Sequence, residues 1–337
     1  MRQATFFSFL ANQQIRCELC PQACILSEGE TGDCLVRTYQ EGTLKTQIYG
    51  TFTAMALEPI EKKPLFHFLP GHRVLSVGSM GCTMNCDYCQ NWPVSQKTEV
   101  PTRFFTPEAL LQQVRLKKAS AICFTYNEPL LMFEYLRDSL PLFQEEKIPV
   151  ILKTSGYIAE EPLKALLPFI NAVNLDLKGS DNGFYQRVCH RELAPVLETA
   201  KLLAKTPSIH LEISHLIVPQ ENDQEFLYHQ LGHWIQRELG VQIPLHLGLF
   251  FPANRFQDKK PTPMAELEKA YRVFRSYLPF TYLSSSAYHL EGLQSLCPFC
   301  QNLLISRNFQ YQIQVHLTAE RACLQCHQSV PFVLSSF

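Results

Sequence analysis

RVLSVGSMGCTMNCDYC, residues 73–89, joins an apolar run typical of a buried strand to three cysteines spaced C-x3-C-x2-C. These cysteines are Cys82, Cys86 and Cys89. The number of thiolates indicates the kind of site, because structural zinc sites and closed cubane clusters use four ligands. Three ligands leave one iron of a [4Fe–4S] cluster free for a cofactor. A three-cysteine zinc site or a coincidental cysteine-rich loop is the alternative, and the position directly after a strand disfavours it.

The open iron of such a cluster suits S-adenosylmethionine, whose methionyl amine and carboxylate can chelate it. One-electron reduction then cleaves the C5′–S bond and gives a 5′-deoxyadenosyl radical, which abstracts a hydrogen atom from a substrate. We therefore predict that Cys82, Cys86 and Cys89 are the catalytic cluster ligands.

Between residues 73 and 285, short apolar runs alternate with longer helical patterns, as in βα units on a parallel sheet. The predicted strands are 73–79, 120–126, 149–154, 171–177, 208–218, 244–250 and, as a seventh, 281–284. The predicted helices are one that begins at Thr106-Pro107 and others at 130–146, 159–168, 195–205, 222–239 and 263–277. Right-handed crossovers would curl this α/β sheet into a barrel or partial barrel, with its chemistry at the carboxyl ends of the strands.

A second group of cysteines precedes the barrel. Cys17, Cys20, Cys24 and Cys34 supply four thiolates and can close a metal site by themselves. Zinc and an accessory iron–sulfur cluster are both compatible with four thiolates, and spacing does not decide between them. Redox-active or unliganded thiols are the alternative.

A third group follows the barrel. Cys297-Pro-Phe-Cys300 and Cys323-Leu-Gln-Cys326 have the spacing of two zinc-ribbon knuckles, and residues 309–317 alternate like a hairpin strand between them. We expect zinc here to stabilise the C-terminal tail rather than to take part in catalysis.

Polar side chains follow several predicted strands at their carboxyl ends. Glu128 can accept hydrogen bonds from the ammonium group of a cofactor. Asp176 and Lys178 share one strand face by period-two alternation, which suits ribose or carboxylate contacts. His246 would face the barrel interior. A satisfied polar group near the core is the alternative for each residue, but their shared position at strand ends favours a site.

Composition excludes several classes of partner. The 30 Lys+Arg nearly balance the 31 Asp+Glu, which argues against a nucleic-acid-binding surface. No window approaches 18 uncharged apolar residues, and the N-terminal apolar patch is too short for a signal sequence. We expect a cytoplasmic protein that binds neither membrane nor nucleic acid.

The chain resembles the AmmeMemoRadiSam system radical SAM enzymes, a branch related to pyruvate formate-lyase activating enzymes. The resemblance spans nearly the whole chain. The matching segments are Gly32 to Arg37, Glu58 to Gly71, Cys82 to Trp92, Tyr126 to Pro129, Asp176 to Gly179, Val218 to Asp223, Pro244 to His246 and the terminal ribbon.

The resemblance implies a partial (β/α)6 radical SAM barrel, a [4Fe–4S] cluster and S-adenosylmethionine. Tyr88 matches the aromatic position beside the adenine, Glu128 the amino-group contact and His246 a sixth-strand contact. The predicted cofactor-binding residues are Tyr88, Glu128, Ser155, Asp176, Lys178 and His246. The implied partners are Memo-type and AMMECR-type proteins, and a reduced flavodoxin or ferredoxin suits the low potential of the cluster.

The chain departs from the family pattern in three places. Ser155 stands where such enzymes commonly carry asparagine, and three serines at 284–286 replace a Gly-Asn pair. Gln301 and His327 stand where the ribbon knuckles usually carry glycine. The first two changes affect the edge of the barrel where a substrate is expected to bind, and the third affects the geometry of the zinc ribbon. The cluster motif is unchanged.

We predict three parts: an N-terminal four-cysteine knuckle and lead-in segment over 1–70, a radical SAM partial barrel over 71–290 and a four-cysteine zinc-ribbon-like module over 291–337. The predicted activity is reductive cleavage of S-adenosylmethionine for hydrogen abstraction from a protein or small-molecule substrate that the sequence does not identify. The alternatives are a glycyl-radical-enzyme activating enzyme, a non-catalytic zinc and iron–sulfur scaffold, and a zinc-ribbon nucleic-acid binder.

Overall fold

The computed structural model describes residues 1–283 and 291–334. Its centre is an eight-stranded sheet in the order β16-β15-β14-β13-β12-β11-β9-β8. The parallel strands are β9 (Arg73–Gly78), β11 (Ala121–Phe124), β12 (Val150–Thr154), β13 (Ala172–Asp176), β14 (His210–Ile217), β15 (Leu245–Leu249) and β16 (Thr281–Leu283). Each parallel pair joins strands that are consecutive among these seven, so the sheet is the predicted α/β partial barrel. Residues 284–286 lie outside the described residues.

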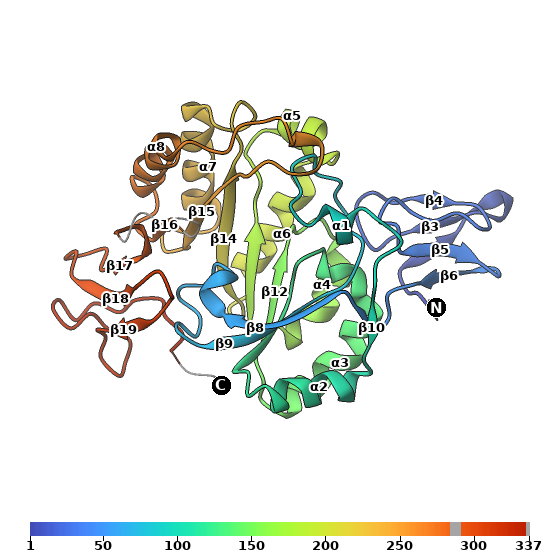
Figure 1. Ribbon diagram of the computed structural model, residues 1–337, viewed down its shortest axis with the longest axis horizontal. Helices are drawn as coiled ribbons and strands as arrows, with labels where there is room; N and C mark the ends of the chain where they lie inside the picture. The colour runs from blue at the N-terminus through green and yellow to red at the C-terminus, as the bar shows by residue number, and fades with distance from the viewer. Residues whose placement is uncertain (284–290, 335–337) are drawn as a thin grey trace.

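Helices connect the parallel strands and lie outside the sheet (Figure 1). They are α2 (Pro107–Leu116), α3 (Phe133–Glu145), α4 (Glu160–Leu166), α6 (Ala194–Ala204), α7 (Glu225–Glu238) and α8 (Met264–Arg275), with the short α1 (Trp92–Ser95) and α5 (Asn182–Phe184) in loops. The helix predicted to begin at Thr106-Pro107 is α2, and Thr106 caps its N-terminus, because Thr106 Oγ1 accepts a hydrogen bond of 3.2 Å from the Ala109 N–H. No helix in the described part of the chain is long and apolar enough to cross a membrane.

The strands are covered on both faces, which explains their continuous apolar runs. Val74, Leu75 and Val77 of β9 are all fully buried, although successive side chains point to opposite faces of the sheet. Polar residues follow these apolar runs at the carboxyl ends of the strands. The sequence pattern that predicts the sheet therefore also predicts which of its edges carries polar side chains.

One strand of the central sheet was not predicted. β8 (Ala54–Pro59) runs antiparallel to β9 along its full length, although it lies within the segment predicted to precede the barrel. Its residues are all only half-buried, as expected for an edge strand with one face toward solvent. The proposed division at residue 70 stays a prediction.

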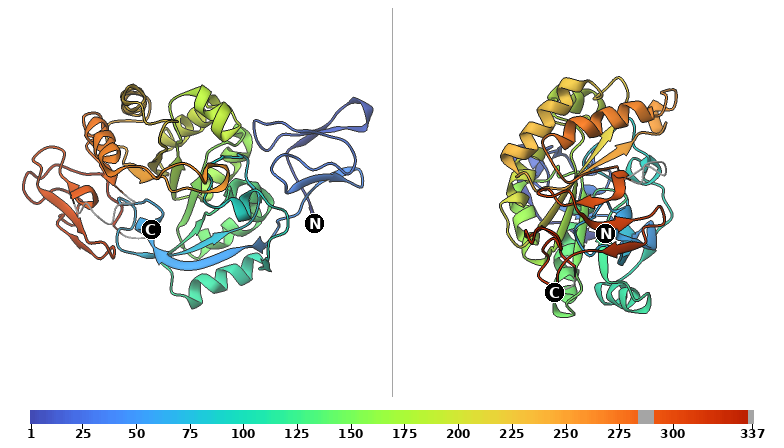
Figure 2. Two further views of the ribbon diagram at one scale, coloured as in Figure 1. Left: turned by 45° about the horizontal axis from the view of Figure 1, so that its top comes forward. Right: turned by 90° about the vertical axis from the view of Figure 1, so that its left-hand side faces the viewer.

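Small sheets stand at opposite ends of the molecule (Figures 1 and 2). The N-terminal strands are β1 (Arg2–Gln3), β2 (Phe7–Phe9), β3 (Ile15–Cys17), β4 (Ile25–Leu26), β5 (Arg37–Gln40) and β6 (Thr43–Thr46). The C-terminal strands are β17 (Ser295–Leu296), β18 (Leu303–Arg307) and β19 (Ile313–Val315). β7 (Thr51–Phe52) pairs with β10 (Arg103–Phe104).

The strand predicted over 309–317 is wrong in its bounds. Only β19 is a strand there, and it pairs with β18 through a tight turn. Asn308 Oδ1 accepts hydrogen bonds from the backbone N–H groups of Gln310 (3.0 Å) and Gln312 (2.9 Å), which makes the turn. The apolar alternation therefore crosses a turn and does not form one continuous strand.

Candidate active site

A cavity of about 440 Å³ opens at the carboxyl ends of the barrel strands. It has the size of a small-molecule or cofactor site. Nine residues predicted from the sequence line it together: Cys82, Cys86, Cys89, Tyr88, Glu128, Ser155, Asp176, Lys178 and His246. They come from the loop after β9, from the carboxyl ends of β11, β12 and β13 with the residues that follow them, and from the second position of β15, so the barrel gathers residues that are up to 164 positions apart in the chain.

The three cysteines of the C-x3-C-x2-C loop face this cavity. The Met84 N–H donates to Cys82 Sγ at 3.4 Å, and Ser95 Oγ lies 3.3 Å from Cys89 Sγ. Burial raises the pKa of the Cys82 and Cys89 thiols, so metal binding is what would stabilise their thiolate forms. Three sulfurs beside an open cavity match the donor set of a [4Fe–4S] cluster with one iron left for another ligand.

A segment that the sequence did not mark holds this loop in place. The π-helical turn over Tyr185–Cys189 offers the carbonyls of Val188 and Cys189 to the N–H groups of Asp87 (2.9 Å) and Asn85 (3.3 Å). Such π turns are frequent at functional sites. Next to the turn, Arg191 Nε donates to the Thr83 carbonyl at 2.6 Å. The cluster loop is therefore fixed by long-range backbone contacts.

Cys189 also contacts the site through its side chain. Tyr88 Oη lies 3.9 Å from Cys189 Sγ. The neighbouring Cys189 thiol is the main reason that the pKa of Cys86 is lowered despite its burial. The sequence offered no signal for this contact, because Cys189 stands outside the three cysteine groups.

Glu128 is almost fully buried, at 1% exposure, and is held by four hydrogen bonds. Oε1 accepts from Thr154 Oγ1 (2.6 Å) and the Leu130 N–H (3.2 Å), and Oε2 accepts from Ser155 Oγ (2.6 Å) and its N–H (3.0 Å). Burial nevertheless raises the pKa of this carboxyl. A buried carboxylate in this setting gains from an added cation. Ser155, the departure from the family pattern, thus orients Glu128.

Asp176 and Lys178 form an ion pair at the end of β13. Lys178 Nζ lies 3.0 Å from Asp176 Oδ2. Burial by itself would raise the pKa of Asp176, but the combined effect of the Lys178 and Lys153 charges and the Lys178 hydrogen bond lowers it. Lys178 Nζ also lies 5.8 Å above the centre of the Tyr88 ring. The pair presents both a donor and an acceptor to the cavity.

His246 lines the cavity from within β15 and is held there by Glu212. His246 Nε2 is 2.6 Å from Glu212 Oε2, and both side chains are fully buried. The Nδ1 atom of His246 has no partner among the described residues. Glu212 was not predicted, although the alternation of His210, Glu212 and Ser214 with apolar neighbours in β14 is a visible signal.

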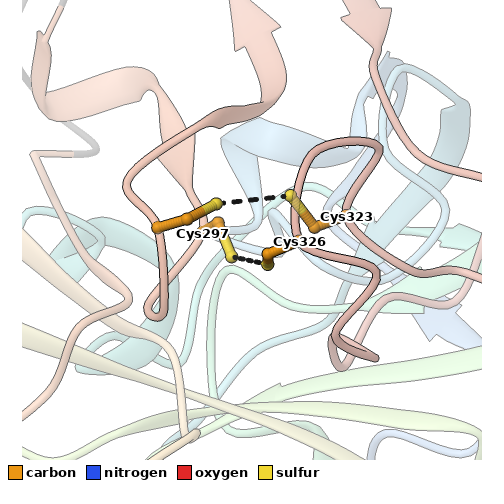
Figure 3. A group of neighbouring side chains, drawn as sticks. Cys297, Cys323 and Cys326 are labelled. Carbon is orange, nitrogen blue, oxygen red and sulfur yellow. Dashed lines mark hydrogen bonds between the residues drawn. The ribbon is translucent and has the colours of Figure 1, made fainter.

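The C-terminal cysteines form a compact group. Cys297 Sγ lies 3.5 Å from Cys326 Sγ, and Cys300 Sγ lies 3.6 Å from Cys323 Sγ. Figure 3 shows side chains from two loops pointing at one another, and all four sulfurs lie within 4.8 Å. A tetrahedral zinc ion with Zn–S bonds of about 2.3 Å needs sulfurs about 3.8 Å apart. The group therefore fits zinc.

The ribbon knuckles keep their turn without glycine. Gln301 has φ 60° and His327 has φ 57°, in the left-handed region that favours glycine. The N–H of each residue donates to the carbonyl four positions earlier, at 2.9 Å, which closes the knuckle around the cysteines. The two substitutions thus strain the backbone but preserve the geometry.

The N-terminal cysteines gather around a second, much smaller cavity. Cys17, Cys20, Cys24 and Cys34 all line it, together with apolar side chains such as Leu131. The four thiols predicted to share a metal site are therefore brought together by β3, β4 and their loops.

Comparison with known proteins gives three findings. The model of the radical SAM superfamily matches residues 77–229. An uncharacterized protein of Methanocaldococcus jannaschii is 38% identical over 340 residues, which cover 99% of this chain and all of that protein. The (2S)-3-sulfopropanediol dehydratase activating enzyme of Klebsiella oxytoca is 23% identical over 70% of this chain and 73% of its own length.

Among solved structures, the fold is similar to that of a radical SAM methyltransferase from Sphaerobacter thermophilus. The TM-score is 0.51 at 15% identity, with 69% of this chain and 71% of that chain covered. At this identity the likeness concerns the fold alone.

Proposed function

Because the chain belongs to the radical SAM superfamily, whose members are enzymes that use a [4Fe–4S] cluster and S-adenosylmethionine, we propose that it cleaves this cofactor reductively and abstracts a hydrogen atom from a substrate. The observation that carries the proposal is the single cavity lined by three cysteine thiols, the Glu128 carboxylate and the Asp176–Lys178 pair. When bound, the cluster and its cofactor supply a 5′-deoxyadenosyl radical.

The protein's own residues divide the binding task. Cys82, Cys86 and Cys89 would hold three irons of the cluster. Glu128, buried and already oriented by hydrogen bonds from Thr154 and Ser155, would accept from the cofactor's ammonium group. An acceptor that is already fixed loses little freedom on binding.

The remaining contacts lie on the other side of the cavity. Asp176 and Lys178 would hold the ribose hydroxyls and the carboxylate, with Tyr88 placed against the adenine. His246 offers the free Nδ1 atom described above, and its bond to Glu212 fixes the ring orientation. These polar groups would position the cofactor in the cavity.

The finer assignment is an enzyme of the AmmeMemoRadiSam type. It is supported by the motifs that extend over nearly the whole chain, outside the residues that match the superfamily model. Memo-type and AMMECR-type proteins are then the partners to test, and a reduced flavodoxin or ferredoxin is the electron donor.

A glycyl-radical activating enzyme is the second candidate function. The similarity to the Klebsiella oxytoca activating enzyme favours it. This candidate requires a protein substrate whose glycine reaches the cavity, so activation would give a stable protein radical detectable by electron paramagnetic resonance (EPR). A small-molecule substrate would leave no such signal on a partner protein.

The test is an assay of 5′-deoxyadenosine. The protein is reconstituted anaerobically with iron and sulfide, reduced with dithionite and mixed with S-adenosylmethionine. We expect product from the wild type and none from Cys86→Ala. Cys123→Ala is the matched control, because Cys123 is a fully buried thiol on β11 outside the cavity, and this variant should keep the activity. No product from a fully loaded and reduced wild type would contradict the proposal and favour a scaffold.

A further inference from the structure

The N-terminal cysteines occupy a site that the proposed reaction does not use. Cys17 ends β3, Cys20 and Cys24 lie in the turn before β4, and Cys34 precedes β5. All four line the small cavity described above, whose other walls combine leucine side chains with polar and charged residues. The group therefore has the composition of a closed metal site.

The spacing of the sulfurs separates two kinds of site in this molecule. Among the described residues, the C-terminal group alone brings three or more ligand atoms within 4.8 Å of one another, as a single zinc ion requires. The N-terminal sulfurs are spread more widely than this and enclose a cavity. The same is true of Cys82, Cys86 and Cys89, the predicted ligands of a [4Fe–4S] cluster. A cubane needs the wider spacing, because four irons and four sulfides lie between the thiolates.

A buried arginine gives independent support for an anionic group in this cavity. Arg37 is 1% exposed and lines the cavity, and its Nη2 donates to Glu134 Oε1 and the Thr5 carbonyl, each at 2.7 Å. Its Nε and Nη1 atoms have no partner within the described parts of the chain. Buried hydrogen-bond donors without a partner cost free energy of folding. A metal centre with four thiolates would supply the negative charge with which these two guanidinium nitrogens could interact. Arg191 lines the same cavity.

We propose that Cys17, Cys20, Cys24 and Cys34 hold a second [4Fe–4S] cluster, closed by four thiolates and therefore unable to bind S-adenosylmethionine. The site adjoins the first one. A side chain at Gly81, the residue before Cys82, would come within 2.5 Å of the Cys34 carbonyl, and Thr83 lines the second cavity. The inference does not depend on the proposed activity, because it concerns only the content of this site.

The experiment uses the full chain with Cys82, Cys86 and Cys89 all changed to alanine, which leaves the N-terminal cysteines intact. After anaerobic reconstitution, metals are counted by mass spectrometry and sulfide is measured chemically. We expect about four iron and four sulfide ions with about one zinc ion per chain, against about eight iron ions in the wild type. Reduction with dithionite should give an EPR signal that S-adenosylmethionine does not change.

Two outcomes overturn the proposal. The first is a triple variant with no iron and about two zinc ions per chain, which would make the N-terminal site a zinc site. The second is one iron without sulfide, which would make it a mononuclear site. If the triple variant does not fold, the wild type can still show whether the chain holds one cluster or two. Mössbauer spectroscopy would find about eight cluster irons per chain if the proposal holds and about four if it does not.

Discussion

The Nε2 atom of His246 lies 2.6 Å from the Oε2 atom of Glu212, and both side chains are completely buried. Glu212 also accepts from the backbone N–H groups of Phe66 (3.0 Å) and His67 (2.8 Å) and lies 2.9 Å from His210 Nε2. The Glu212 carboxylate thus links His246, which lines the cavity, to the segment that contains Phe66 and His67. His67 in turn stacks on Phe332, so the C-terminal tail belongs to the same network.

Glu212→Gln should destabilise the protein by about 3 to 5 kcal/mol, because an amide cannot accept from all four donors and would leave buried groups unpaired. Thermal unfolding of the anaerobically loaded protein measures this. Glu225→Gln is the control, because Glu225 is largely exposed and its loss should change little. A Tm for Glu212→Gln equal to that of the control would contradict the assigned network.

The pH dependence of stability should carry a contribution from His215. Burial lowers the pKa of this imidazole from 6.5 to about 4. The unfolded chain therefore takes up its proton first as the pH falls, so the stabilisation is complete above pH 6.5 and is lost between pH 6.5 and about 4. The full loss is roughly 3 kcal/mol.

His215→Asn isolates this contribution, because asparagine can still donate to the Leu177 carbonyl, which lies 3.0 Å from His215 Nδ1, but does not titrate. The difference in Tm between wild type and variant should shrink steadily as the pH is lowered from about 7 to about 4.5. A difference that stays constant over this range would show that His215 titrates normally in the folded protein.

The sequence predicted the barrel because parallel strands covered on both faces leave continuous apolar runs, and each run ends at the functional edge. It also placed Glu128 and the Asp176–Lys178 pair at that edge. It missed the contact of Cys189 with the site and the pairing of the edge strand β8 with β9, because both depend on contacts across the fold that no local pattern records. Its error over 309–317 has a local cause, the turn made by the Asn308 side chain.

Glu128→Gln should weaken the binding of S-adenosylmethionine about 10- to 100-fold, because it removes a charge-assisted hydrogen bond worth about 1.5 to 3 kcal/mol. Binding is measured by anaerobic calorimetry on the cluster-loaded protein. Ser155→Ala is the graded comparison. It removes the 2.6 Å bond to Glu128 Oε2 but keeps the carboxylate, so we expect a smaller loss of affinity. Equal affinity of Glu128→Gln and wild type would exclude the ammonium contact.

The knuckle position of His327 offers a test of the ribbon. Its side chain is exposed, and a non-glycine residue at φ 57° costs about 1 kcal/mol. If the four ribbon cysteines hold zinc, as their spacing allows, His327→Gly should slow zinc release to a chelator or leave it unchanged, since the greater freedom of glycine in the unfolded chain offsets part of the gain.

The opposite change sharpens this test. His327→Val should speed zinc release, because a β-branched side chain fits the left-handed region poorly, while His327→Asn should fall between valine and glycine because asparagine tolerates that region. The expected order of release rates is thus Val, Asn, Gly from fastest to slowest. Release rates that do not follow this order would mean that the knuckle relaxes when zinc is bound and that backbone strain at His327 does not limit the stability of the site.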